Sequence, residues 1–146
     1  MSPKTILLVE DNPSDVGLAQ RAFENSRIKN HLVVAQDGEE ALDYLFGIGK
    51  YTGRDPRQQP ALVLLDIKLP GLDGIEVLKH IRANPITQRQ PVVMLSSSKE
   101  VNDIASSYAL GVNSYLHKPV DFNQFTDAIQ QIGLYWLVLN EVPPKI

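Results

Sequence analysis

Short apolar runs alternate along the chain with stretches in which apolar residues recur every three or four positions. The apolar runs predict strands, and several are apolar on both faces, as is typical of a buried parallel sheet. These strands are expected at Thr5–Val9, Leu32–Gln36, Ala61–Leu65, Val92–Leu95 and Ser114–His117. The periodic stretches predict helices near Ser14–Ser26, Glu39–Gly47, Ile75–Asn84 and Val101–Leu110, with a fifth helix beginning near Asp121–Phe122.

This alternation predicts an α/β fold, a doubly wound five-stranded parallel sheet of (βα)5 topology with flavodoxin-like strand order. Right-handed crossovers would place helices on both faces of the sheet. We expect a single domain over residues 1–146, with a core at about 4–132 and an extended last helix and tail at 133–146.

The segment before the third predicted strand, residues 47–60, is rich in glycine, proline and charge. It is about twice as long as a usual connection, which often indicates function or mobility. A tolerated surface insertion is the simpler alternative.

Composition sets limits on the class of protein. The chain has 146 residues, 43% of them hydrophobic, which is enough for one globular core. Its formal net charge is −3 and no long basic run occurs, so we expect no nucleic-acid partner. The absence of cysteine excludes disulfides and thiolate metal sites. The apolar runs are far shorter than the roughly 20 residues that span a bilayer. The N-terminus has no apolar signal region, so we expect a cytoplasmic protein with no membrane partner.

Polar residues directly follow four of the predicted strands. Glu10 and Asp11 follow the first strand, Asp66 the third, Ser96 lies at the end of the fourth, and Lys118 follows the fifth. Open α/β sheets place their sites at the carboxyl ends of the strands, so these side chains are expected to lie together. Three carboxylates at close range repel one another, so the cluster needs a cation. A lysine and a hydroxyl beside it indicate a phosphoryl group as the ligand.

These residues, in this order and spacing, resemble the receiver domains of two-component response regulators. The resemblance covers about residues 4–132 and depends on Val9-Glu10-Asp11-Asn12, the run from Leu65 to Gly74, Ser96, Tyr115 and Lys118-Pro119. Three further features resemble a narrower group, the stand-alone regulators of cyanobacterial and bacterial phytochrome histidine kinases. They are the long loop, Leu95-Ser96-Ser97-Ser98 and Leu134-Tyr135-Trp136-Leu137.

The resemblance implies a role for four of the residues. Asp66 would accept the phosphoryl group, because a carboxylate is a competent nucleophile once it is in line and relieved of charge repulsion. Lys118 would pair with the phosphoryl group, and Ser96 would donate its hydroxyl to it. Tyr115 would be a switch residue that moves between exposed and inward rotamers. Each of three residues also has a structural alternative. Asp66 would be an acid that caps a helix, Lys118 a solvated surface lysine and Tyr115 a half-buried strand tyrosine.

The resemblance also implies a Mg²⁺ site, since hard oxygen ligands suit this cation. Asp11 and Asp66 would bind the cation directly, the backbone carbonyl of Lys68 would supply another oxygen, and Glu10 would act mainly through water.

The implied function is that of a stand-alone response regulator in phosphorelay signalling. It would take a phosphoryl group from a sensor histidine kinase, of the phytochrome type, onto Asp66 in a Mg²⁺-dependent reaction. It would be a phosphoacceptor switch and not an enzyme in any wider sense. Few residues follow Lys118, so the signal would leave through binding or return to the kinase.

The last predicted helix carries an apolar stripe at spacings of three and four, which is expected to face the core. The stripe comprises Phe122, Phe125, Ile129, Ile132, Trp136 and Leu139. The stretch from Leu134 to Leu139 is apolar all round, and exposed aromatic patches usually mark interfaces. We therefore expect a homodimer through the fifth strand and helix, with Tyr115, Phe122, Tyr135, Trp136 and Leu139 in the interface. A tail that folds back on its own domain is the alternative.

Other classes fit the sequence less well. A phosphatase with an aspartyl nucleophile usually has a second acid two residues later, where this chain has Lys68. A nucleotide-binding domain would need GxGxxG or GxxxxGK[ST], and neither occurs. A receiver-like module that works without phosphorylation is disfavoured by the intact acids, hydroxyl and lysine.

Overall fold

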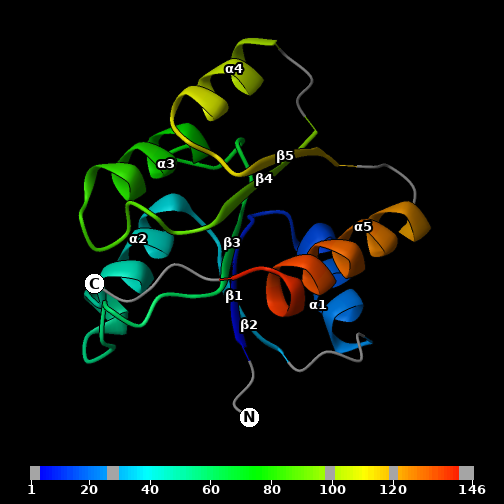
Figure 1. Ribbon diagram of the computed structural model, residues 1–146, viewed down its shortest axis with the longest axis horizontal. Helices are drawn as coiled ribbons and strands as arrows, with labels where there is room; N and C mark the ends of the chain where they lie inside the picture. Colours follow the sequence, from blue (N-terminus) through cyan, green and yellow to red (C-terminus); the bar gives the residue numbers. More distant parts are fainter. Residues whose placement is uncertain (1–3, 26–29, 98–100, 119–121, 142–146) are drawn as a thin grey trace.

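The computed structural model describes residues 4–25, 30–97, 101–118 and 122–141, in which strands and helices alternate (Figure 1). The strands are β1 (Lys4–Val9), β2 (Asn30–Ala35), β3 (Leu62–Leu65), β4 (Val92–Ser96) and β5 (Ser114–His117). The helices are α1 (Pro13–Glu24), α2 (Gly38–Phe46), α3 (Gly74–Ala83), α4 (Val101–Ala109) and α5 (Phe122–Leu134). A 3₁₀ turn, η1 (Gly49–Tyr51), follows α2, and a π-helical turn, η2 (Tyr135–Leu139), extends α5.

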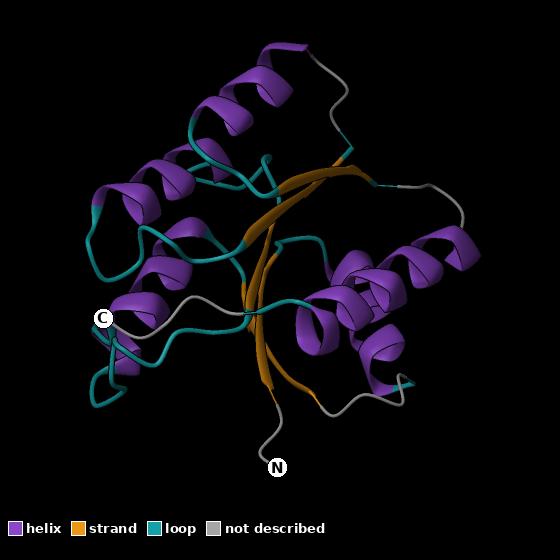
Figure 2. Cartoon of the chain, viewed as in Figure 1, coloured by secondary structure: helices purple, strands orange, loops and turns teal. Residues whose placement is uncertain are grey.

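The five strands form one parallel sheet with the order β2-β1-β3-β4-β5. Helices α1 and α5 cover one face, and α2, α3 and α4 lie on the other (Figure 2). The predicted α/β fold with flavodoxin-like strand order is therefore confirmed. The order reverses between β1 and β3, and in such sheets that switch point is where ligands bind.

Two apolar layers hold the sheet between its helices. Successive residues of a strand point to opposite faces, so Ile6 and Leu8 pack toward α1 and α5, while Leu7 and Val9 pack toward α2 and α3. Strands β3 and β4 are buried along their whole length, as their continuous apolar runs predict. The sheet is thus a rigid base for the loops at its carboxyl edge. Among the described residues, no helix has both the length and the apolar character needed to cross a membrane.

The long connection at residues 47–60 is held against α2 by polar and aromatic contacts. The hydroxyl of Tyr51 donates to Glu40 Oε2 at 2.8 Å, and Lys50 Nζ lies 2.9 Å from the same oxygen. The guanidinium of Arg54 lies 4.1 Å from the ring centre of Tyr44. These contacts tie the segment to one helix, on the side of the sheet that carries α2 and α3.

The last helix follows the predicted apolar stripe through Ile132 and, half-buried, Trp136, but not as far as Leu139. After Leu134 the backbone forms a π-helical turn, in which the Asn140 N–H donates to the Tyr135 carbonyl at 2.7 Å. This wider turn moves the inward position by one residue, so that Leu137 is buried, at 4% exposure. Leu139 is 65% exposed, and the prediction that it faces the core is wrong for this reason.

The other members of the predicted stripe differ in how far they are buried. Phe125 and Ile129 are buried against α1 and the sheet, as expected, and Trp136 is half-buried against the same layer. The side chain of Phe122 lies outside the described part of the structure.

Candidate functional site

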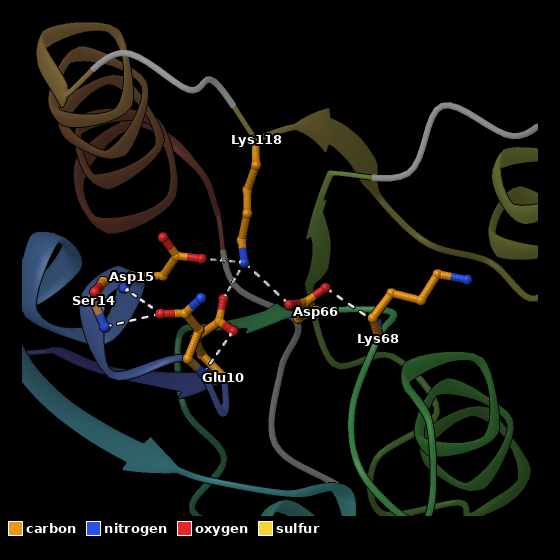
Figure 3. A network of polar contacts seen from close by, with 7 residues as sticks. Glu10, Ser14, Asp15, Asp66, Lys68 and Lys118 are labelled. Carbon is orange, nitrogen blue, oxygen red and sulfur yellow. Dashed lines mark hydrogen bonds and ion pairs between the residues drawn. The ribbon is translucent and has the colours of Figure 1, made fainter.

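The carboxyl ends of β1, β3 and β5 bring an acidic cluster and one lysine together (Figure 3). Backbone hydrogen bonds continue the sheet just past its strands. The Glu10 N–H donates to the Ala35 carbonyl at 3.0 Å, and the Asp66 N–H donates to the Val9 carbonyl at 3.1 Å. These bonds fix the two acids on either side of the switch point between β1 and β3.

Three carboxylates form a group that could hold a metal ion. Glu10, Asp11 and Asp66 each offer an oxygen, and these oxygens lie within 4.8 Å of one another. Glu10 and Asp66 are 2% and 7% exposed, whereas Asp11 is exposed. An all-oxygen set with one side open to water suits a small hard cation, which keeps several of its water ligands. The residues present therefore fit a divalent cation.

Lys118 places its ammonium among the carboxylates, with a side chain that is only 11% exposed. Its Nζ lies 2.5 Å from Glu10 Oε1, 2.7 Å from Asp15 Oδ2 and 3.1 Å from Asp66 Oδ2. A lysine ammonium has three donors, so three carboxylates match its capacity. The lysine is bound in the site and is not a solvated surface residue.

Burial and charge shift the titration of this cluster in two directions. Burial raises the pKa of Glu10 to about 7, the negative charge of Asp66 adds to this, and Lys118 opposes it. For Lys118, burial favours the neutral form, but the hydrogen bonds from its ammonium to Asp15 and Glu10 and the charge of Asp66 outweigh it. The pKa of Lys118 is therefore raised above its ordinary value. The lysine stays charged, and the site titrates near neutral pH through Glu10.

The backbone after Asp66 orients its carboxylate. The Lys68 N–H donates to Asp66 Oδ1 at 3.2 Å, so the other oxygen, Oδ2, faces Lys118. The Lys68 side chain is directed elsewhere, with its Nζ 3.8 Å from Asp103 of α4. Its backbone carbonyl stays a predicted metal ligand.

The other two predicted site residues lie on β4 and β5. Ser96 is fully buried at the end of β4, and its carbonyl accepts from the Lys118 N–H at 2.7 Å. Tyr115 is half-buried and packs against the apolar layer on the side of α2 and α3. The structure thus brings Ser96 to the site through its backbone and places Tyr115 on the neighbouring strand, and their chemical roles stay predictions.

Two residues of the site were not among those predicted from the sequence. Asp15 reaches Lys118 across 103 positions of sequence, from the first turn of α1. Gly74 opens α3, and a Cβ there would overlap the backbone carbonyl oxygen of Asp66. Two sequence features could have indicated these residues. They are the helix start at Asn12-Pro13 for Asp15 and the helix start at Asp73-Gly74 for Gly74, since each places the first turn of a helix beside the end of a strand.

Residues 6–130 match the family described as the response regulator receiver domain. The chain belongs to this family, as its fold and its resemblance in sequence predicted.

Several similar proteins are response regulators, and two of those named here are phytochrome response regulators. The response regulator Rcp1 of Synechocystis sp. is 40% identical over 97% of this chain and 94% of its own length. The phosphorylated cyanobacterial phytochrome response regulator RcpA has a TM-score of 0.91 at 40% identity, over 98% of this chain and 100% of that one. The Mn²⁺-bound form of Rcp1 has a TM-score of 0.89 at 39% identity, over 97% and 100% of the two chains. The bacteriophytochrome response regulator AtBRR is 51% identical, with a TM-score of 0.75 over 97% and 100% of the two chains.

Proposed function

We propose that this response regulator accepts a phosphoryl group on Asp66 from a sensor histidine kinase of the phytochrome type. The observation that carries the proposal is the environment of Asp66. This 7% exposed carboxylate lies between two further acids that could hold a cation and the ammonium of Lys118. The names of RcpA and AtBRR as phytochrome response regulators support a kinase of that type.

In the proposed reaction an oxygen of Asp66 attacks the phosphorus of a phosphohistidine. The bond from phosphorus to the Asp66 oxygen forms as the bond from phosphorus to the imidazole nitrogen breaks, and the product is an acyl phosphate. Lys118, already 3.1 Å from Asp66, stabilises negative charge on the transferred group. The hydroxyl of Ser96 donates to another phosphoryl oxygen.

Glu10, Asp11 and Asp66 would hold Mg²⁺, with a further oxygen from the backbone of Lys68. When bound, the cation supplies positive charge that offsets the repulsion among the acids and the charge on the phosphoryl oxygens. The Mn²⁺-bound form of Rcp1 supports a divalent cation in this family.

The proposed output is a change of shape on the face of α4, β5 and α5. A phosphoryl group adds charge and acceptor oxygens beside Ser96, which is fully buried at the end of β4. A shift of Ser96 toward those oxygens would open space that favours an inward Tyr115, from the neighbouring strand β5. Phosphorylation would then shift the populations of two states.

The first test replaces the proposed acceptor. Incubation with acetyl phosphate and Mg²⁺ is expected to add one phosphoryl group to the wild type and none to Asp66→Asn, as measured by intact-protein mass spectrometry. EDTA is expected to abolish the adduct, because the acids then lack their cation. Asp127→Asn, which changes an exposed acid on α5, serves as the matched control and is expected to keep the adduct. An adduct on Asp66→Asn would show that another residue is the acceptor.

We also propose a homodimer formed through β5 and the extended α5. The supporting feature is the η2 patch, in which Leu134, Tyr135, Val138 and Leu139 are 48%, 51%, 55% and 65% exposed. Tyr135 also packs edge-to-face on Trp136, with ring centres 5.1 Å apart. A contiguous apolar surface of this kind usually marks an interface. Tyr115 and Phe122 stay in the proposed interface as predictions.

The dimer is tested by introducing charge into the η2 patch. Light scattering is expected to give a dimer mass for the wild type at tens of micromolar and a monomer mass for Val138→Glu/Leu139→Glu. Buried glutamates without partners would destabilise the interface. Gln131→Glu, an exposed polar position on α5, is the control for added charge and is expected to stay dimeric. A monomeric wild type, with and without phosphorylation, would contradict the proposal.

A further inference from the structure

Asp15 lies in the site but has no part in the mechanism above. Its carboxylate oxygen Oδ2 lies 2.7 Å from the ammonium of Lys118, and its side chain is 25% exposed. Figure 3 shows Asp15 on one side of that ammonium and Asp66 on the other. Asp15 therefore contacts the group that is proposed to meet the phosphoryl oxygens, from the side opposite the acceptor.

The start of α1 holds Asp15 in this place. The side-chain oxygen of Asn12 accepts from the N–H groups of Ser14 and Asp15, at 2.9 and 3.3 Å, and Pro13 occupies the first helical turn. A capped and proline-initiated turn has little freedom to move. Asp15 is thus a fixed anchor that the helix presents to the lysine that directly follows β5.

The three contacts of the ammonium differ in length. Those to Glu10 and Asp15 are 2.5 and 2.7 Å, whereas the contact to Asp66 is 3.1 Å. Since the ammonium has three donors, the two shorter contacts fix two N–H groups and direct the third toward Asp66. When a phosphoryl group is attached to Asp66, this third donor faces its oxygens, and the two anchors need not be broken.

We propose that Asp15 is a positioning residue for phosphoryl transfer, which together with Glu10 holds the Lys118 ammonium so that its remaining donor faces the acceptor. This inference rests on the proposed function of Asp66. The side chain acts through Lys118 and does not itself contact the reacting atoms. Its contribution depends on an acceptor oxygen at this position and not on its charge alone.

Two substitutions separate the anchor from the charge. Asp15→Asn removes the charge but keeps a side-chain oxygen at the same distance along the chain, whereas Asp15→Ala removes both. The rate of phosphorylation by acetyl phosphate at saturating Mg²⁺ is expected to be roughly tenfold lower for Asp15→Ala than for Asp15→Asn. Both variants lose one negative charge, so any weakening of cation binding is the same in both. The rate measured over a series of Mg²⁺ concentrations shows that weakening separately. Glu39→Ala, at an exposed acid in the first turn of α2, controls for net charge and is expected to match the wild type.

A second readout needs no phosphorylation. The side-chain ¹⁵N–¹H signal of the Lys118 ammonium, assigned by its loss in Lys118→Arg, reports how long its protons are protected from water. This signal is expected in the wild type and Asp15→Asn, and is expected to be broadened or lost in Asp15→Ala, because one of the two anchors is gone. Thermal unfolding of each variant shows whether the fold is retained.

The outcomes separate the two proposals. If the wild type forms no adduct under any condition, the function of Asp66 fails whatever Asp15 does. If the wild type is phosphorylated and the two Asp15 variants react at the same rate, the positioning role is wrong. A faster reaction in Asp15→Ala would also overturn it, since Asp15 would then hold the lysine back.

Discussion

Replacement of Lys118 with methionine is expected to lower the free energy of unfolding by about 3–5 kcal/mol at about pH 8 without divalent cations. Glu10 and Asp66 are 2% and 7% exposed, and the lysine ammonium contacts both of them. Removal of this ammonium leaves buried carboxylates that repel one another with no compensating charge. Urea unfolding measures the loss as a shift of the midpoint at constant slope.

The deficit of Lys118→Met is expected to shrink as the pH falls to about 5, because protonation removes the unpaired charges. In the wild type the pKa of Glu10 is already raised from 4.5 to about 7. The folded state therefore holds this proton more tightly than the unfolded chain does. Its contribution to stability is fully present below pH 4.5 and is lost as the pH rises through about 7. Without the lysine this loss on the alkaline side becomes larger.

Lys50 provides the matched control for this prediction. Its Nζ also lies close to a carboxylate, 2.9 Å from Glu40, but its side chain is 66% exposed. Lys50→Met is expected to change stability little, since water and salt screen an exposed pair. Added Mg²⁺ is expected to stabilise Lys118→Met more than the wild type, because the cation replaces the missing positive charge. Equal losses in the two lysine variants would contradict a special role for the buried ammonium.

Strand positions and the grouping of the acids were predictable because both follow from short-range rules. The short apolar runs around Leu64 and Val93 are typical of strands that lie between two layers of helices. In a parallel sheet every strand ends at the same edge, so Glu10, Asp66 and Lys118 were expected at one edge of the sheet. The apolar runs, together with the polar residues that follow them, thus indicated the edge at which the site lies.

Asp15 was not predictable in the same way. Its sequence neighbours, Pro13 and Ser14, indicate only the start of a helix, and many helices begin with an acid in the first turn. Its partner lies 103 residues away, and the contact depends on how α1 is angled against the end of β5. That angle is set by packing between α1 and α5, which a linear pattern does not contain.

The pattern of buried residues at the end of α5 could not be predicted for another reason. A period of 3.6 places Trp136 and Leu139 on the inward face, but in the π-helical turn the inward position moves from Trp136 to Leu137, and Leu139 is exposed. The stretch from Tyr135 to Leu139 is apolar throughout, so its sequence does not favour one phase over the other. Where all positions are apolar, the helix phase follows from tertiary packing, and the residues left outside form the η2 patch.

Replacement of Gly74 with alanine is expected to damage both the fold and the site. A Cβ at this position would overlap the backbone carbonyl oxygen of Asp66 and lie 2.7 Å from the Cα of Ile67. Both atoms belong to the backbone, so no side chain can rotate away, and α3 or the loop after β3 must move. We expect a loss of about 3 kcal/mol in stability. Phosphorylation is expected to slow about a hundredfold, because Asp66 is displaced from the other two acids of the proposed cation site and from Lys118.

Gly17→Ala is the matched control, since it makes the same chemical change in the interior of α1. A Cβ there meets no atom within 4 Å, so the substitution only removes the unfavourable helix propensity of glycine. It is expected to stabilise the protein by about 0.5–1 kcal/mol and to leave phosphorylation unchanged. Urea unfolding would then show effects of opposite sign for the two glycines, and the acetyl phosphate assay would show a slower reaction for Gly74→Ala alone. If Gly74→Ala were as stable and as reactive as Gly17→Ala, the close approach of α3 to the acceptor loop would have no functional consequence. The opposite result would show that the contact between a helix start and a strand end determines where the acceptor carboxylate lies.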